Sequence, residues 1–512
     1  MLPNGRDAVG IATRTALAAP PHTPRPITVV PVLLIGVLIE VALGIGLVWP
    51  AWLFRHHAAI PAPEPLAAVL GLRWSGLARV AATFTLWLAG YAAVLALMRR
   101  PLTIGARRAL VVLPVLFAGT LLGMLPVSSK DVYHYLMEGR ALAVYGDNPM
   151  SVPPAAYPED PLAWTVSSWG DTPSRYGPAF NLLAAAVVAV TGDNLVATLL
   201  GFKLLTVAAL FGTAALAWRT ARRLRPEAAL PAYVFVAWNP LALYEAAANA
   251  HNDLLMVFAT ALALDLGVRR RWAAALPALA LGALAKYVVG LLGPLFLIES
   301  TAPARAKSAP RAVRPPRSFW LGIAFALALA VVLYAPFWNG RHTFDAVTSA
   351  SGDMLSSPGW LLRQALKHRF GWEGAKLPVM LLMSAAFLAG YGCLLRRHWW
   401  AARAGGTSAE RLAAFALAAL ALELCTLSWW LWPWYVLWLL PPAALLVGRW
   451  PAGAVAVASG AALLAYIPLN FRELFWGPPT TDRMPLAVVL LLFLPTLAAT
   501  AVFWWRARAR HW

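Results

Sequence analysis

The chain has 512 residues, of which 60% are hydrophobic and only 12% are charged. Soluble proteins contain about 25% charged residues, so this composition excludes an ordinary soluble domain and predicts a polytopic, all-α membrane protein. The net charge of +20 comes from basic residues scattered between apolar runs, which excludes nucleic acid as a partner and indicates positively charged cytoplasmic loops. Cys393 and Cys425 both lie in apolar segments and support neither a disulfide framework nor a metal site.

The first part of the chain predicts a polar segment followed by three spans. Residues 1–27 are expected to be cytoplasmic, and the apolar run 28–49 is too long for a signal-peptide core, so we expect a retained anchor. Spans near 78–98 and 108–127 flank a loop with four arginines, which the positive-inside rule places in the cytoplasm. The loop 128–177 is then expected on the outer face.

The apolar segment 178–192 is not expected to cross the bilayer. If it crossed, the next span, 195–218, would deliver a cluster of arginines at 219–225 to the outer side, against the positive-inside rule. We therefore expect 178–192 to be a re-entrant or juxtamembrane helix. Such partial insertions persist only where protein or a wet cavity covers them.

The remaining apolar segments complete a bundle of roughly 12–14 membrane segments with both termini in the cytoplasm. Residues 273–298 are expected to form two short helices that meet near Lys286. A basic linker at 300–317 is expected to separate an N-terminal catalytic module, 28–299, from a C-terminal module, 318–512. The other spans are expected near 229–249, 253–268, 318–336, 378–397, 412–430, 434–448, 452–468 and 485–505.

The outer loop carries the richest mixture of polar side chains, in VSSKDVYHYLMEGRALAVYGDNPM. On a helix that begins near Asp131, this acid shares one face with Tyr135 and Glu138, because they are spaced i, i+4 and i+7. Tyr133 and Arg140 belong to the same stretch. An interfacial helix with tyrosines at headgroup level would explain the aromatic residues, but an acid at the membrane boundary favours a functional site.

Two further polar clusters are expected at the same outer boundary. In TPSRYGPAF, Arg175 and Tyr176 precede the turn into the re-entrant helix, and Arg175 is either an interface anchor or a phosphate ligand. In NAHNDLLM and the turn before it, hydrogen-bonding groups gather at a helix end; they are Glu245, Asn249, His251, Asn252 and Asp253. A polar helix–helix contact is the alternative to a site, and two ligands alone do not define a metal centre.

Cations inside apolar segments complete the candidate set. Lys286 lies midway in an apolar segment, where lysine is rare and usually functional, whereas Lys203 could also snorkel to the interface. Arg472 belongs to another outer loop. An aromatic run that includes Trp434 and Tyr435 forms either an interfacial belt or a wall for a sugar or an isoprenoid.

This combination suits a substrate with a charged head and a lipid tail, such as a polyprenyl-phosphate sugar. Its phosphate is already a leaving group, so the paired carboxylates of a glycosidase are not needed. Asp131 is predicted to act as the general base on the acceptor hydroxyl, and a single displacement would invert the anomeric centre. The cations predicted to stabilise the departing phosphate are Lys286, Arg175, Lys203, Arg140 and Arg472.

The motifs resemble those of polyprenyl-phosphate-mannose-dependent α-1,6-mannosyltransferases of the GT-C superfamily. The similarity lies in SSKDVYHYLMEGRALAVYGDNPM, AHNDLLM, ALAKYVVGLLGP and PWYVLWLLP, in this order over residues 110–445. The resemblance implies a GT-C helical bundle in the cell envelope that transfers mannose to a glycan or glycolipid. It also implies that Asp131 is the base beside a cavity lined by His251, Asn252 and Asp253. It leaves open whether a divalent cation takes part.

Departures from the family pattern leave the sugar and the acceptor open. The turn at Arg175 reads Arg-Tyr-Gly-Pro instead of Tyr-Pro-Pro, and Met150 stands where tyrosine is common. Two other functions also remain open. A transporter or flippase of lipid-linked sugars predicts polar groups through the whole membrane depth, and a polymerase or ligase predicts a polyprenyl-diphosphate donor.

Overall fold

The computed structural model of the protein describes residues 25–56, 66–166, 169–302, 314–349, 354–404, 408–477 and 483–509. Within these ranges the chain forms helices joined by loops and isolated bridges, and it contains no strand. The all-α fold predicted from the composition is therefore confirmed. Most of the predicted linker 300–317 and of the N-terminal segment 1–27 lies outside the described residues.

Among the described residues, eight helices are long and apolar enough to cross a membrane, which confirms a polytopic membrane protein. They are α1 with its terminal π-helical turn (Val29–Val48), α4 (Trp74–Leu97), α5 (Ile104–Leu122), α8 (Leu195–Leu224), α14 with its 3₁₀ turn (Arg317–Phe337), α16 (Pro358–Ala404), α19 (Trp450–Asn470) and α21 (Arg483–Ala509). The remaining α-helices are α2 (Leu53–His56), α3 (Leu66–Val69), α6 (Asp131–Ala143), α7 (Pro178–Thr191), α9 (Ala229–Ala237), α10 (Pro240–Leu243), α11 (Asp253–Val268), α12 (Trp272–Ala285), α13 (Gly293–Ser300), α15 (Asp345–Ser349), α17 (Ser408–Thr426), α18 (Leu440–Ala444) and α20 (Arg472–Trp476).

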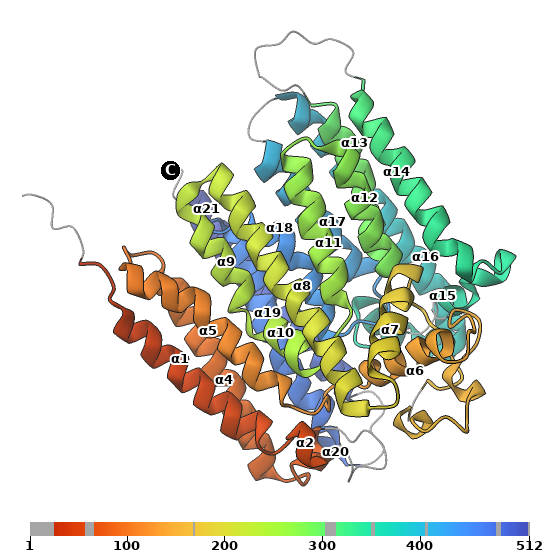
Figure 1. Ribbon diagram of the computed structural model, residues 1–512. Helices are drawn as coiled ribbons and strands as arrows, with labels where there is room; N and C mark the ends of the chain where they lie inside the picture. The colour runs from red at the N-terminus through yellow and green to blue at the C-terminus, as the bar shows by residue number, and fades with distance from the viewer. Residues whose placement is uncertain are drawn as a thin grey trace, which may run out of the picture.

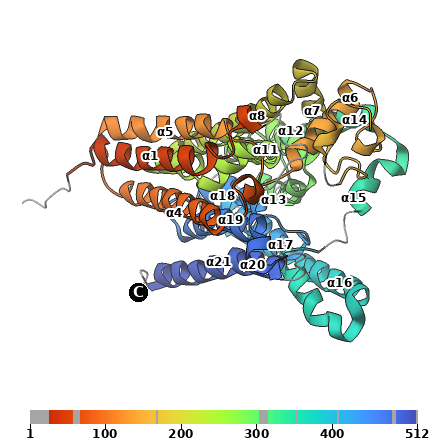
Figure 2. The ribbon, with the colours of Figure 1, turned by 90° about the horizontal axis from the view of Figure 1, so that it is seen from below.

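The helices pack around one continuous hydrophobic core that runs from α1 to α21, so both halves of the chain share it. Figure 1 shows α1, α4 and α5 together on one side of the bundle and α14 and α16 on the other. The views in Figures 1 and 2 agree that α6 and α7 lie together, beside the end at which α8 begins.

The predicted interruption at Lys286 is present. Helix α12 ends at Ala285, Lys286 adopts an extended conformation with φ −151° and ψ 120°, and a 3₁₀ helix over Tyr287–Leu292 leads into α13. The expectation of two short helices that meet at this lysine is therefore confirmed. Non-helical backbone at membrane depth requires cover by protein or by a wet cavity.

Two predicted spans differ from regular helices. The segment 229–249 is divided at Asn239-Pro240 and ends in a π-helical turn over Tyr244–Ala248. The segment 434–448 is a 3₁₀ helix over Pro433–Leu439 followed by the short α18. The prolines in both segments lack a backbone N–H and crowd the preceding turn, which explains why hydrophobic runs of sufficient length do not continue as α-helices.

Helix α7 agrees with the predicted non-crossing segment. Its 14 residues span about 21 Å at the usual helical rise, which is less than the hydrocarbon core of about 30 Å. The helix begins beside the end of α12, where the N–H of Gly177 donates to the carbonyl of Ala285 at 3.1 Å. It ends at Gly192, shortly before α8 begins.

Two glycines allow this close packing. A Cβ atom on Gly177 would lie 2.0 Å from the carbonyl oxygen of Leu284 in α12, and one on Gly139 in α6 would lie 2.6 Å from the carbonyl oxygen of Ala184 in α7. Both contacts are with backbone, which cannot move aside as a side chain can. Helix α6, helix α7 and the interruption at Lys286 are therefore held together by backbone contact.

We expect Gly177→Ala to destabilise the protein by about 1–3 kcal/mol or more, because the added methyl group must push α7 away from α12. The measurement is the thermal unfolding midpoint of the detergent-purified protein. The matched control is Gly119→Ala in α5, where a Cβ would meet nothing within 4 Å and alanine should be neutral or stabilising by up to about 1 kcal/mol. Equal midpoints for the two variants would contradict the packing argument.

Candidate functional site

Helix α6 begins at Asp131, as its sequence predicted. The hydroxyl of Tyr176 donates to Oδ2 of Asp131 at 3.3 Å and lies 3.5 Å from the hydroxyl of Tyr135. The Tyr135 ring is fully buried and meets the Tyr176 ring edge to face. Because 33% of the Asp131 side chain remains exposed, the carboxylate is oriented by the protein and still accessible to a ligand.

The imidazole of His251 faces this carboxylate. Its Nε2 lies 3.8 Å from Oδ2 of Asp131, and its Nδ1 is bonded to the carboxylate of Glu245. Asn249 donates to the same Glu245 oxygen at 3.0 Å. The imidazole also stacks on the ring of Trp434, with centroids 4.0 Å apart and an angle of 22°. Since a carboxylate only accepts, Nδ1 carries a hydrogen, and the orientation of Nε2 toward Asp131 is fixed from two sides.

A second charged pair lies at the interruption between α12 and α13. Nζ of Lys286 donates to both oxygens of Asp253, at 2.8 and 2.9 Å, and Nε1 of Trp438 donates to Oδ1 of Asp253 at 2.6 Å. Nζ also lies 4.6 Å from the ring centroid of Tyr435 and 5.9 Å from that of Tyr176. These aromatic faces stabilise the cation. An ammonium group has three donors, so one remains for a ligand.

Several buried polar atoms in the predicted motifs have no hydrogen-bond partner. Buried polar atoms are normally paired, so unpaired ones mark strain or a site for a missing ligand. Within the described ranges, such atoms include Glu138 Oε2, Arg175 Nε, Asn249 Oδ1, His251 Nε2 and Asn252 Oδ1. These atoms point to a polar ligand that contacts the predicted residues.

Three of the predicted residues have partners elsewhere in the protein, and a fourth is exposed. Arg140 pairs with Asp160 at 2.6 Å and with Asp193 at 2.7 Å. Lys203 donates to the carbonyl of Leu122, the last residue of α5, and to that of Met124, two residues further on. The other two are Tyr133, whose hydroxyl donates to the carbonyl of Pro126, and Arg472, which is exposed at the start of α20.

These positions do not support the phosphate-binding role that the sequence predicts for Arg140 and Lys203. Arg140 ties the outer loop to the turn between α7 and α8, and Lys203 places a positive charge at the carbonyl end of a helix, where it is favourable. Among the described residues, neither side chain forms a hydrogen bond or ion pair with Asp131, His251 or Lys286. Lys286 and Arg175 are the cations that remain near the candidate site.

Trp438 is a residue of the site that sequence reasoning did not select. It contributes a hydrogen bond to Asp253 and an aromatic face 5.4 Å from Nζ of Lys286. In a 3₁₀ helix, side chains three residues apart eclipse one another, so Trp438 stands beside Tyr435. Their rings stack with centroids 4.3 Å apart. The three-residue spacing could have identified Trp438, had the 3₁₀ helix been expected.

Burial strongly affects the acids and phenols of the outer loop. Glu138 in α6 is buried, which raises its pKa from 4.5 to about 8, while a hydrogen bond with Ser174 lowers the pKa and the charge of Asp131 raises it. Burial and the charge of Asp131 also raise the pKa of Tyr176 well above its usual value. At neutral pH both groups are therefore largely protonated, so neither adds a negative charge to that of Asp131.

The donor set gives no specific support for a metal ion. Among the residues that the structure describes, no group of three or more His, Cys, Asp or Glu side chains could hold one. Both oxygens of Asp253 are engaged by Lys286, and Oδ1 is also bonded to Trp438. We therefore assign no step to a divalent cation, which the sequence had left open.

The fold and the site define a polytopic all-α membrane protein with a polar site at interrupted helices. Comparisons with known proteins assign it to a family. The profile described as "Alpha-(1->6)-mannopyranosyltransferase, N-terminal domain" matches residues 31–301, which is more than half of the 512-residue chain. The chain therefore belongs to the α-(1→6)-mannopyranosyltransferase family, and the resemblance seen in its motifs is confirmed.

Individual relatives match over part of their length. Alpha-(1->6)-mannopyranosyltransferase A of Mycobacterium tuberculosis is 31% identical over 224 residues, which is 43% of this chain and 42% of the relative. The protein of the same name from Corynebacterium glutamicum is 27% identical over 253 residues, or 47% of this chain and 49% of the relative. The chain thus aligns with less than half the length of these relatives.

We expect Glu138 to make the stability pH-dependent. The pKa of Glu138 in the folded protein, about 8, exceeds the ordinary 4.5. Its contribution to the free energy of unfolding is therefore greatest below pH 4.5 and falls as the pH rises to about 8. The slope is up to about 1.4 kcal/mol per pH unit. Thermal midpoints measured from pH 5 to 9 should therefore fall less steeply for Glu138→Gln than for the wild type. The exposed Glu159→Gln is the control, and parallel profiles for wild type and Glu138→Gln would contradict the argument.

Proposed function

We propose that this protein is a membrane glycosyltransferase that transfers mannose from a polyprenyl-phosphate donor to a glycan or glycolipid acceptor. The observation that carries the proposal is the convergence of Asp131, His251 and the Lys286–Asp253 pair, surrounded by unpartnered buried polar atoms. Membership of the α-(1→6)-mannopyranosyltransferase family supports mannose as the sugar. The names of the relatives, both α-(1→6)-mannopyranosyltransferases, support an α-1,6 linkage in the product.

Asp131 acts as the general base in this proposal. Its partly exposed carboxylate takes the proton of the acceptor hydroxyl while the acceptor oxygen bonds to the anomeric carbon. In the same step the bond from that carbon to the phosphate oxygen breaks, and polyprenyl phosphate leaves with the bonding electrons. A single displacement of this kind inverts the anomeric centre. The Tyr176 hydroxyl and Nε2 of His251 are placed to orient the carboxylate or the incoming hydroxyl.

Lys286 stabilises the phosphate that departs. Two of its donors are held by Asp253, so the ammonium group is fixed in place while one donor stays available. A cation that is already oriented stabilises developing negative charge without reorganisation during the reaction. Arg175, whose guanidinium lies 5.2 Å from the ring centroid of Trp169, supplies a second cation at the end of the outer loop. Asp253 and Trp438 act as positioning residues.

The aromatic wall provides a surface for the sugar or for the isoprenoid chain. The rings of Trp432 and Trp434 stack with centroids 5.1 Å apart, and Trp434 in turn stacks on His251. Aromatic faces of this kind bind the apolar faces of sugars and the methyl groups of isoprenoids. The wall therefore connects the proposed catalytic carboxylate with the loop that follows α17.

We place this site on the outer face of the cell membrane, with both termini in the cytoplasm. Clusters of arginine mark the last turns of α8 and α21. These helix ends lie at the end of the bundle away from α6 (Figure 1). The positive-inside rule assigns that basic end to the cytoplasm, so α6 and Asp131 face outward.

Asp131→Asn should reduce mannose transfer by at least about 100-fold, since general-base catalysis contributes roughly 10²–10⁴. The assay follows labelled mannose from polyprenyl-phosphate mannose into product in membranes that contain equal amounts of folded enzyme. Asp171→Asn, an exposed acid of the same loop, is the control and should retain full activity.

The same assay separates the alternatives. Full activity of Asp131→Asn would exclude Asp131 as the base. Movement of the labelled lipid across the membrane without any glycosidic product would favour a flippase. Preference for a polyprenyl-diphosphate sugar in a donor competition would favour a polymerase or ligase.

Two substitutions of Lys286 should distinguish the effect of its positive charge on activity from the effect of its packing. Lys286→Gln should lower kcat by about 100-fold or more, because it removes the cation from the departing phosphate. Lys286→Arg keeps the charge and the pair with Asp253 and should retain more activity than Lys286→Gln. Thermal midpoints check that both variants are folded. Equal kcat values for the two folded variants would show that the positive charge has no role in transfer.

A further inference from the structure

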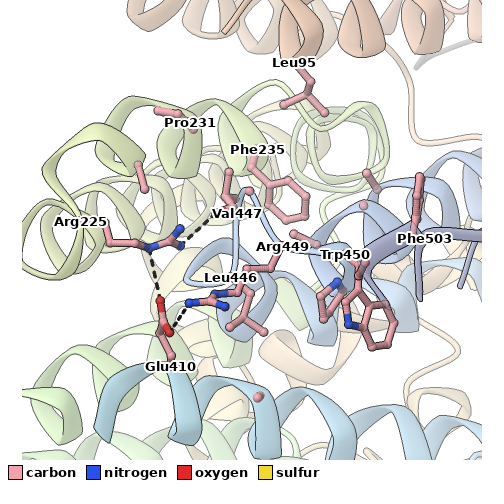
Figure 3. Close-up of a pocket in the computed structure, with 18 of the residues that line it drawn as sticks. Leu95, Arg225, Pro231, Phe235, Glu410, Leu446, Val447, Arg449, Trp450 and Phe503 are labelled. Atoms are coloured by element: carbon pink, nitrogen blue, oxygen red, sulfur yellow. Dashed lines mark hydrogen bonds and ion pairs between the residues drawn. The ribbon is translucent and has the colours of Figure 1, made fainter. Parts of the chain in front are cut away.

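A cavity of about 1520 Å³ opens among the helix ends at the basic end of the bundle (Figure 3). The last turns of α8 and α21 mark this end, away from α6 (Figure 1). Its walls come from the last turn of α4, from α9, from the first turns of α17 and α19, and from the last turns of α21. Nothing in the proposed sugar transfer uses this cavity. Its position at the ends of membrane-spanning helices places it at the level of one lipid headgroup layer.

The lining of the cavity carries an excess of positive charge. Six arginines line it against two glutamates; the arginines are Arg99, Arg225, Arg411, Arg449, Arg506 and Arg508. Glu410 lies between Arg225, at 3.4 Å, and Arg449, at 2.5 Å (Figure 3). Arg411 pairs with Glu299, outside the lining, at 2.8 Å.

Three arginines of the lining are exposed and lack an acidic partner among the described residues: Arg99, Arg506 and Arg508. They approach from two walls, because Arg99 follows α4 and the other two belong to α21. The guanidinium of Arg508 lies 4.0 Å from the ring centroid of Trp504, which orients it. These three are therefore the cations available to an incoming anion.

Apolar side chains line the cavity beside these cations. Leu95, Phe235, Trp450 and Phe503 are among the lining residues (Figure 3). Helix α19 begins here with Arg449 as its N-cap, whose side chain makes no capping hydrogen bond, so the first backbone N–H groups also favour a negative charge. Cations beside apolar walls suit a ligand with an anionic head and hydrocarbon chains.

We propose that this cavity binds the phosphodiester headgroup of an anionic membrane lipid, with the acyl chains along the apolar walls. The headgroup meets Arg99, Arg506 and Arg508, while Arg225 and Arg449 remain paired with Glu410. Basic pockets between membrane helices on the cytoplasmic side are recognised sites for such headgroups. The apolar walls and the position at helix ends favour a lipid over a soluble phosphate, and the unpaired arginines favour an anionic over a zwitterionic lipid.

The test uses the full-length protein, delipidated in detergent, with short-chain phosphatidylglycerol as the probe and native mass spectrometry as the readout. Arg506→Gln/Arg508→Gln should weaken binding by about 25-fold, because each basic residue near an anionic headgroup contributes about a five-fold factor. The matched control is Arg222→Gln/Arg223→Gln, which removes the same charge from exposed arginines at the end of α8 outside the cavity. This control should bind like the wild type.

Two further probes identify the ligand class. Phosphatidylcholine with the same chains should bind weakly to every variant, and inorganic phosphate at millimolar concentration should not displace phosphatidylglycerol. If the double variant does not purify as a folded protein, Arg99→Gln tests the opposite wall and should weaken binding about five-fold. The proposal would be overturned if the control variant lost as much phosphatidylglycerol binding as the cavity variants, or if the cavity variants bound it like the wild type. It would also be overturned if phosphatidylcholine were retained equally well, or if phosphate displaced phosphatidylglycerol. Binding is measured without transfer activity, so its failure is distinct from failure of the proposed enzyme function.

Discussion

The low polarity of the bilayer interior is the constraint on which this structure depends. A charged or polar group there must find a partner within the protein. Several buried charged groups away from the site meet this condition: Asp265 accepts from Thr220 at 2.8 Å and pairs with Arg219 at 2.5 Å, and Lys203 donates to carbonyls at the end of α5. At the candidate site the condition is met only in part, and the unpartnered polar atoms there indicate a site for a polar ligand.

The interrupted helices and the polar cluster support each other. Asp253 is the first residue of α11, Lys286 stands in the extended link after α12, and Trp438 belongs to a 3₁₀ helix. None of these three side chains would meet the others from the middle of regular, parallel helices. Their mutual hydrogen bonds pair the polar side chains that the interruptions bring together, so these groups are not buried without a partner. Removing one charge of this pair would leave the other buried without compensation, which usually costs about 3–5 kcal/mol.

The two ends of the bundle carry different chemistry. The end near α6 collects carboxylates, imidazole, phenols and indoles in a partly closed site, whereas the other end collects arginines around an open cavity. The first arrangement suits a reaction in which charge develops at a fixed point. The second suits the reversible binding of an anionic surface group. The asymmetry of charge on which the proposed membrane orientation rests therefore also separates the two proposed binding sites.

The sequence by itself determined the membrane class, the helical fold, the start of α6 at Asp131 and the break at Lys286, because apolar length, positive charge and isolated polar residues act locally. Its motifs also selected the side chains that meet at the site. Only the tertiary structure decided which cations remain available there. Arg140 and Lys203 look like Lys286 in the sequence, yet their partners, Asp160 and the carbonyls at the end of α5, come from distant segments. The role of Trp438 likewise depends on a 3₁₀ helix and on Asp253, 185 residues away, which no local pattern encodes.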